Sequence, residues 1–322
     1  MSMMVRIASL VAALLAAGSC YAQSGYPNRS VRVIAPFTAG GPTDVIARIL
    51  AQKLSESLGQ QFYVENLAGA GGNLGTGTAA KAPHDGYTLI VVSTGFVVNP
   101  SPYAKVPYDP IKDFAPISLI AASPNVMVVN PQVPAKTVQE LVTLVRTNPG
   151  KYSFAGPGVG STPHLAGELL KIKYKLDLVH VPFNGAAPAV TSTIAGHTPI
   201  ALTALPPSMG NIKEGTLRAL AVLSANRHPA IPDVPNAIEA GVPDLESDTL
   251  TGLLVPTGTP PEIIALLHRE VAKMVAQPEV KERLDALGFV PVANTPVEFA
   301  ARIKSELGRW ADVVKAANIH IE

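Results

Sequence analysis

Apolar residues along the chain fall into short runs typical of buried strands, and these alternate with helical stripes. The run Val31–Ala35 predicts a strand, and Ile46, Ile49 and Leu54 then recur at helical spacing, which predicts a helix over 42–58. Gly59 suits the end of that helix because glycine readily adopts the left-handed conformation found there. Strands are expected next over 61–65 and 87–93. Alternation of this kind predicts a parallel sheet flanked by helices.

The same alternation continues through the rest of the chain. We expect further strands over 117–121, 126–130, 152–155, 178–181, 200–205, 217–223 and 249–255. We expect further helices over 78–81, 137–148, 163–171, 188–195, 260–276, 278–287 and 296–316. The chain therefore has two strand–helix blocks, which predict an α/β protein of two lobes. Residues 23–122 and 224–322 are assigned to lobe 1, and residues 123–223 to lobe 2.

Turns rich in small residues follow the carboxyl ends of several predicted strands. They lie at 38–41, 69–77, 93–95, 156–162 and 183–187. Where a helix begins after such a turn, its free N–H groups and the positive end of its dipole favour an anion. The alternative is that these turns only connect strand to helix, as they do in many α/β folds. Their repetition favours binding, and ligands of parallel sheets lie beyond the carboxyl ends of the strands.

The composition is that of a folded protein, and the N-terminal segment resembles an export signal. The chain has 322 residues, 47% of them hydrophobic and 15% charged, enough to bury large cores. Residues 1–22 are typical of a secretory signal peptide, with Arg6 before an apolar run and a cleavage site after Ala22. A lipoprotein cleaved at Cys20 is the alternative. Cys20 is the single cysteine, so the mature chain would have no disulfide and no thiolate chemistry, and we expect it in the periplasm.

The net charge of the chain indicates which kinds of partner it is suited to bind. Without residues 1–22 the chain has 24 basic and 24 acidic residues, which favours neither nucleic acid nor an anionic membrane. The small-residue turns contain no Lys or Arg between 38 and 41, 69 and 77, 156 and 164, or 183 and 187. The charge of an acidic ligand would therefore be met by backbone N–H groups, helix dipoles and neutral side chains. Asp44 is expected to support the start of its helix and not to face the ligand.

The sequence matches known catalytic and cofactor-binding motifs only incompletely. Gly75, Gly77 and Ala80 match the Gly-x-Gly-x-x-Ala dinucleotide pattern, but the next strand ends without the acid that would bind a ribose. Ser161 lacks the flanking glycines of a nucleophile elbow. The seven histidines show no metal-ligand spacing, and His164 is better explained as a structural histidine. We expect no cofactor, no metal and no catalytic residue.

Several motifs, in order along the chain, carry a resemblance to a known family. They include Pro36-Phe-Thr-Ala-Gly-Gly-Pro-Thr-Asp44, Glu65-Asn-Leu-Ala-Gly-Ala-Gly-Gly-Asn-Leu-Gly75, Val181-Pro-Phe-Asn-Gly-Ala-Ala-Pro188 and Gly252-Leu-Leu-Val-Pro256. The chain resembles the substrate-binding proteins of tripartite tricarboxylate transporters, the Bug family, over essentially its whole mature length. The resemblance implies a type II periplasmic binding-protein fold, with two mostly parallel sheets flanked by helices around a central cleft. It also implies a small carboxylated ligand and no catalysis.

The resemblance also implies which residues bind the ligand. Carried onto this chain, the candidates are Phe37, Thr38, Ala39, Gly41, Ala70, Gly72, Thr94, Asn99, Ser161, Thr162, His164, Asn184 and Thr203. Thr203 stands where many members carry an aspartate, which disfavours an amino-acid ligand. Asn184 stands where Lys or Arg is common, which removes a charge near the cleft.

The expected function is capture of a mono-, di- or tricarboxylate, aromatic acids included, by a monomeric periplasmic receptor. The expected partner is a membrane permease of the tripartite type or a sensor. Two alternatives stay open at this point: an exported α/β enzyme that acts on a carboxylate, and an orphan receptor that serves a signalling partner.

Overall fold

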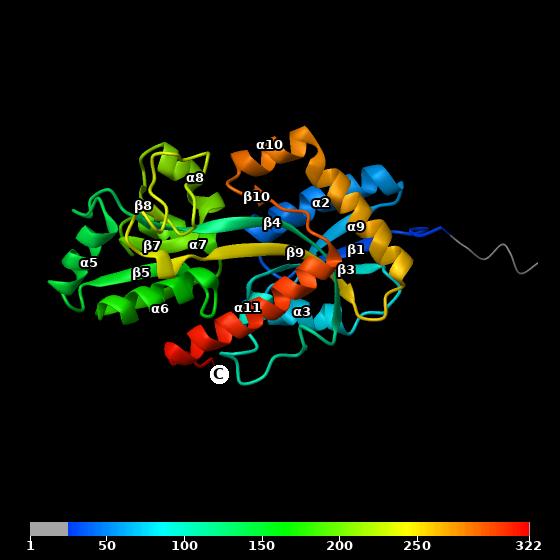
Figure 1. Cartoon of the computed structure of the whole chain (residues 1–322), viewed down its shortest axis with the longest axis horizontal. Coiled ribbons are helices and arrows are strands. Elements are labelled where there is room, and N and C mark those ends of the chain that lie inside the picture. The colour runs from blue at the N-terminus through cyan, green and yellow to red at the C-terminus, as the bar shows by residue number, and fades with distance from the viewer. Residues whose placement is uncertain (1–24, 322) are drawn as a thin grey trace, which may run out of the picture.

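The computed structural model describes residues 25–321, so the predicted signal peptide, its cleavage site and Cys20 lie outside the described residues. One long mixed sheet carries helices on both faces (Figure 1). Its strands run in the spatial order β2-β1-β3-β9-β4-β7-β5-β6, with β8 and β10 paired to β4. The expected α/β architecture is confirmed, and the two expected sheets are joined into one through β4 and β9.

The first half of the sheet follows the predicted order closely. Its elements are β1 (Val31–Ala35), α2 (Pro42–Leu58), β2 (Phe62–Asn66), a 3-10 turn η2 (Ala70–Gly72), α3 (Asn73–Ala80), β3 (Thr88–Ser93) and α4 (Gly95–Val98). β1 pairs in parallel with β2 and with β3, so the carboxyl ends of these strands share one edge. Helix α2 has Pro42 at its start, where the missing N–H costs nothing, and Gly59 in the left-handed conformation at its end.

Strand β4 (Phe114–Val129) joins the halves and replaces the two short strands predicted over 117–121 and 126–130. Pro124 lies between those two apolar runs and has no backbone N–H to donate, so the sequence predicts a break in the strand there. The strand passes through Pro124 because its two ends have different partners. Residues up to Pro124 pair with β9 (Asp248–Pro256), and residues from Asn125 pair with β7 (Ile200–Ala204) and β8 (Arg218–Val222).

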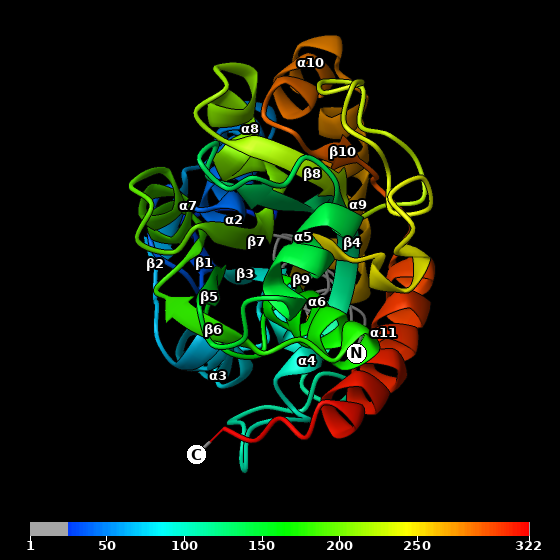
Figure 2. The same cartoon turned by 90° about the vertical axis from the view of Figure 1, so that its left-hand side faces the viewer.

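The second half repeats the strand–helix logic. Its further elements are α5 (Val138–Arg146), β5 (Tyr152–Pro157), α6 (Thr162–Tyr174), β6 (Leu178–Phe183), α7 (Ala186–Ile194), α8 (Leu205–Lys213) and η3 (Pro243–Leu245). β5 pairs in parallel with β6 and β7. Helices α5 and α6 cover one face of these strands, while α7 and α8 cover the other (Figure 2).

The chain closes with helices that pack on the first half. These are α9 (Pro261–Ala276), α10 (Pro278–Ala286) and α11 (Pro296–Ala316), with the short strand β10 (Val290–Pro291) between α10 and α11. Thr295 and Glu298 form a reciprocal capping box at the start of α11, which fixes where that helix begins. Trp310 and Val314 of α11 share a buried cluster with Leu165 of α6, so α11 also touches the second half.

Helix α3 corrects one prediction. The expected short helix over 78–81 instead begins at Asn73, and the glycines read as a turn lie within it. A Cβ on Gly75 would approach Pro36, and one on Gly77 would approach Pro107, both below 3.0 Å. These glycines therefore allow close packing of α3, which explains the dinucleotide-like pattern without a cofactor.

The predicted return to lobe 1 at residue 224 stays a prediction, and the packing favours a later point. Ala237, Val242 and Leu245 belong to the buried core of the second half. The chain returns to the first half along β9, which begins at Asp248. No helix among residues 25–321 combines the length and the apolar character needed to cross a membrane.

Gly252 of β9 offers a test of this packing. A Cβ at this position would lie 2.2 Å from Phe299 of α11. We expect Gly252→Ala to lower the free energy of unfolding by about 1–3 kcal/mol through overpacking. Gly210→Ala is the control, because Gly210 lies on the exposed side of α8 with open space around it. Urea unfolding of both variants checks this, and equal stabilities would contradict the described contact.

Candidate functional site

A cavity of about 420 Å³ lies between the two halves, at the carboxyl ends of the parallel strands. It is lined from the first half by turns that follow β1, β2 and β3, and from the second half by turns that follow β5, β6 and β7. The turns at 38–41, 69–72 and 93–95 thus open onto one cavity, as the sequence predicts. Thr249 of β9 also reaches it.

Helix starts converge on this cavity. Its lining includes the N-cap residue or the first residues of α2, α3, α4, α6, α7 and α8, namely Gly41, Gly72, Thr94, Ser161, Gly185 and Ala204. No side chain caps α2, α3, α7 or α8 by a hydrogen bond. The starts of α2 and α7 offer the N–H groups of Thr43, Asp44, Ala186 and Ala187, and the positive ends of the helix dipoles add to one another. At the start of α8 only Leu205 can donate, because Pro206 and Pro207 have no N–H. At the start of α3 the N–H groups of Asn73 and Leu74 are already bonded to Ala70 and Gly69.

The lining contains no Lys, Arg, His, Asp or Glu among the described residues. Its polar side chains are neutral hydroxyls and amides, among them Thr38, Ser93, Asn99, Asn184 and Thr249. Within residues 25–321 no group of three or more His, Cys, Asp or Glu is placed to hold a metal ion. The arrangement can accept an anion through backbone donors, and it supplies no charged partner for a cation.

Asp44 shapes the first turn from outside the cavity. Its carboxylate accepts hydrogen bonds from the Gly40 N–H, the Arg48 guanidinium and the Asn66 amide at 2.8–2.9 Å. Burial acts to raise the pKa of Asp44, but these hydrogen bonds outweigh it and lower the pKa below its ordinary value. The expected supporting role of Asp44 is confirmed, since the carboxylate is tied to the turn and does not line the cavity.

Asn99 supports the second turn. Its amide donates to the Gly71 carbonyl at 3.0 Å and to the Asn73 side chain at 2.8 Å. Gly71 and Gly72 both have positive φ, which lets the chain turn sharply into α3. Asn99 is buried, so its amide holds this turn in one conformation while one side of the residue borders the cavity.

Two neutral histidines lie behind the turn that starts α6. His164 accepts a hydrogen bond from the Gly160 N–H at 3.1 Å, and its ring lies 4.2 Å from the ring of His180. Burial lowers the pKa of His164 to about 3, with further lowering from His180 and Lys171. Burial and Lys171 lower the pKa of His180 to about 4. Both rings are therefore uncharged at neutral pH, and His164 fixes the shape of the turn.

The two sides of the cavity approach each other at its rim. A Cβ built on Gly185 would lie 3.7 Å from the Thr38 hydroxyl across the cavity. A Cβ built on Gly160 would lie 3.5 Å from Asn99 and from Ile321. These distances are ordinary van der Waals contacts, and glycine is favoured at both positions because φ is positive there.

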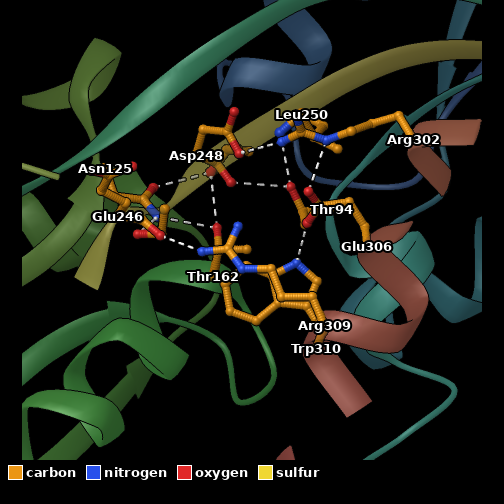
Figure 3. A network of polar contacts seen from close by, with 12 residues as sticks. Thr94, Asn125, Thr162, Glu246, Asp248, Leu250, Arg302, Glu306, Arg309 and Trp310 are labelled. Atoms are coloured by element: carbon orange, nitrogen blue, oxygen red, sulfur yellow. Dashed lines mark hydrogen bonds and ion pairs between the residues drawn. The ribbon is translucent and has the colours of Figure 1, made fainter. Parts of the chain in front are cut away.

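A polar network connects the cavity to α11 (Figure 3). The Leu250 N–H donates to the Thr94 hydroxyl at 2.8 Å, so a lining residue is fixed to β9. On the same strand, Asp248 faces Arg302 of α11, and Arg302 also pairs with Glu306. Burial raises the pKa of Asp248, while Arg302 counteracts that rise. Glu306 also accepts a hydrogen bond from the Trp310 indole N–H at 2.6 Å, so the network ends at a buried side chain of α11.

Most of the predicted site residues line this cavity. These are Phe37, Thr38, Gly41, Ala70, Gly72, Thr94, Asn99, Ser161, Thr162 and Asn184. Ala39, His164 and Thr203 are not among the lining residues, so the structure does not place these three predicted residues at the cavity surface. Ala39 is exposed, His164 lies behind Gly160, and Thr203 is fully buried on the inner part of β7.

Sequence reasoning missed Ser93, Phe183, Ala204 and Thr249 as lining residues. Ser93 and Phe183 each end a strand within a turn already singled out, and Ala204 ends the predicted strand over 200–205, so attention to strand ends could have found all three. Thr249 could not be found this way, because it lies at the start of a strand that passes between the halves.

Known proteins show strong similarity to this chain. Residues 46–319 match the family model described as tripartite tricarboxylate transporter family receptor. The protein BugT of Bordetella pertussis is 37% identical, with 90% of each chain covered. An R. palustris protein solved with adipate is 34% identical with a TM-score of 0.88, covering 92% of this chain and 99% of that one. MatC from Rhodopseudomonas palustris, solved with bound malate, is 35% identical with a TM-score of 0.82, covering 90% of this chain and 100% of that one.

The histidine pair predicts a characteristic pH dependence of stability. The folded pKa values of about 3 and 4 lie below the ordinary value of 6.5, so the unfolded chain binds more protons below pH 6.5. The stability that the neutral rings provide is therefore full above pH 6.5 and is lost as the pH falls towards 4. At pH 5 we expect a loss on the order of 1–2 kcal/mol per histidine.

Urea unfolding of the wild type and of a His164→Gln/His180→Gln variant, between pH 7.5 and 4.5, checks this expectation. Glutamine at position 164 can still accept from the Gly160 N–H and cannot titrate. The variant should lose less stability than the wild type over this range. Parallel curves would show that the two rings do not titrate as described.

Proposed function

The chain belongs to the tripartite tricarboxylate transporter receptor family, and we propose that it is a periplasmic receptor that binds a small carboxylate in the cavity between its halves. In this proposal the receptor delivers its ligand to a membrane permease of the tripartite type. Delivery to a sensor is the second possibility for the partner, and the receptor acts as a monomer. It binds without turnover, as the cavity lining has no charged or nucleophilic acid–base pair.

The observation that carries the proposal is the convergence of helix starts on a cavity without charged side chains. An anion is stabilised there by N–H donors and dipoles that are fixed by the fold. A cationic ligand would meet no carboxylate in the lining. The similar proteins solved with adipate and with malate support a carboxylate as the ligand.

We assign one end of the ligand to the first half and the other end to the second half. The turns at 37–41 and 70–72 would hold one carboxylate, with Thr94 and Asn99 beside them. Ser161, Thr162 and Asn184 would hold the other end of the molecule. His164 would act indirectly, because it fixes the Gly160 turn. Contacts from both halves stabilise the closed form, so ligand binding would shift the population of conformers towards closure.

A thermal-shift screen of residues 23–322 tests the proposed function. The panel contains adipate, malate, citrate, benzoate and glutamate. A carboxylate present at 100 times its dissociation constant should stabilise the protein by about 2.7 kcal/mol, which raises the Tm measurably. A response to adipate or malate without any change in the compound after incubation supports a receptor. Silence across the panel contradicts carboxylate binding, and chemical conversion would favour the enzyme.

Asn184 supplies a sharper test of the site. Asn184→Asp adds a negative charge at the start of α7 without changing the size of the side chain. We expect a loss of adipate affinity of about tenfold or more, about 1.4 kcal/mol, because the new charge repels a carboxylate at short range. Calorimetry measures this loss.

Asn226→Asp is the matched control for this variant. Asn226 is exposed on an irregular segment of the same half and does not line the cavity. Its variant carries the same added charge and should bind adipate as the wild type does. An equal loss in both variants would point to net charge and not to the cavity, and no loss in Asn184→Asp would place the ligand away from α7.

A further inference from the structure

Two hydroxyl groups of the cavity lining are held by one residue that the lining does not include. Asn125 is fully buried on β4, beside the point where that strand passes between the halves. Its amide nitrogen donates to the Thr162 hydroxyl at 3.2 Å, and its amide oxygen accepts from the Thr249 hydroxyl at 3.2 Å. The hydroxyls of Thr162 and Thr249 lie 3.3 Å apart, so the three side chains form a closed ring (Figure 3 shows Asn125 beside Thr162).

The Asn125 amide sets the direction of every hydrogen bond in this ring, because its nitrogen can only donate and its oxygen can only accept. The proton of Thr249 is directed to the Asn125 oxygen, so Thr249 can only accept from Thr162. Thr162 already accepts from the Asn125 nitrogen, so its own proton is free to donate. That proton satisfies Thr249 while the cavity holds no acceptor, and it can turn to an acceptor that enters the cavity.

We propose that Asn125 is a positioning residue, which leaves the Thr162 hydroxyl able to donate a hydrogen bond to the ligand. The inference rests on the proposed function, because it concerns how that site holds a carboxylate. A carboxylate oxygen can take the Thr162 proton, because the Asn125 nitrogen occupies a lone pair of that hydroxyl and does not need its proton.

Further hydrogen bonds hold Asn125 in place. Its side-chain nitrogen also donates to the Ser247 hydroxyl at 2.9 Å. Its backbone N–H donates to the Ser247 carbonyl, and its carbonyl accepts from the Leu223 N–H. Asn125 is therefore bonded to two segments of the chain, at Leu223 and at Ser247. The ring of three side chains connects these segments to the cavity.

The decisive variant is Asn125→Asp. An ionised carboxylate cannot donate, so it would accept the Thr162 proton and withdraw it from the ligand. We expect adipate affinity to fall at least tenfold at pH 8.5 and to recover as the pH is lowered to 6.5, where the buried carboxyl gains a proton and can donate again. The titratable and charged groups nearby are Glu246, Asp248, Arg302, Glu306, Arg309 and the neutral His164. All of them are present in the wild type, whose pH profile is the reference.

Asn130→Asp is the matched control. Asn130 follows the same strand, is also buried, and donates to the carbonyls of Thr193 and Ile194 away from the cavity. This variant should bind adipate with the pH profile of the wild type. Asn125→Ser supplies a second, neutral variant: it should lose affinity at least threefold without acquiring a pH dependence.

Thr162→Val decides whether Asn125 acts through Thr162. Valine matches threonine in shape but has no hydroxyl, so adipate affinity should fall, and adding Asn125→Asp should then cost less than twofold more at pH 8.5. A full tenfold further loss would show that the added charge acts through space, which overturns the positioning role. Unchanged affinity in both Asn125 variants overturns it as well.

The wild type separates this inference from the proposed function. If the wild type binds neither adipate nor malate, the proposed function and the positioning role fail together. If it binds either one and the Asn125 variants bind that acid equally well, only the positioning role fails.

Discussion

Backbone N–H groups at the first turn of a helix have no partner within that helix, and this protein gathers several such turns around one cavity. The starts of α2, α6, α7 and α8 all reach it. Helices that follow parallel strands must begin at the carboxyl edge of the sheet, so the arrangement is a consequence of topology. Burying these donors without an acceptor would be costly. An occupant with acceptor groups would satisfy the N–H groups that remain at these helix starts.

The two halves that supply these helix starts are not independent units. Strands β4 and β9 cross between them as neighbours in one sheet, and α11 lies along both. Any opening of the cavity must bend these crossing strands or rotate the halves about them. The polar groups at the crossing, Asn125, Ser247 and Asp248, are bonded to one another, to lining residues or to α11. The same contacts therefore connect the crossing strands to the cavity.

The sequence was a good guide to local elements and a poorer guide to long-range pairing. Buried runs and helical stripes predicted β1, α2 and α11 nearly residue for residue, since period and capping are local properties. The length of β4 was missed, because Pro124 looks like a break and the partners that carry the strand through it are distant in sequence. Gly75 and Gly77 were read as a turn, because only the positions of Pro36 and Pro107 reveal their packing role.

The same distinction applies to the site. Small-residue turns after strands identified most lining residues, since parallel topology brings those turns together. Thr249 and the role of Asn125 were not predictable, because both depend on where two crossing strands place their side chains. His164 and Thr203 were assigned to the site by resemblance, and neither is part of the cavity lining. Each lies next to a lining residue in sequence, but His164 bonds to Gly160 and Thr203 is fully buried.

Recognition through peptide groups also has an evolutionary consequence. A point mutation exchanges a side chain and leaves the N–H of its residue in place, unless the new residue is proline. The proposed binding of an anion in this cavity would therefore survive most single substitutions, whereas a site that depends on one arginine is lost when that arginine is replaced. Lineages that share these strand–helix turns are free to vary the few neutral side chains of the lining. Ligand choice can drift among acids while the capacity to hold an acid is inherited with the fold.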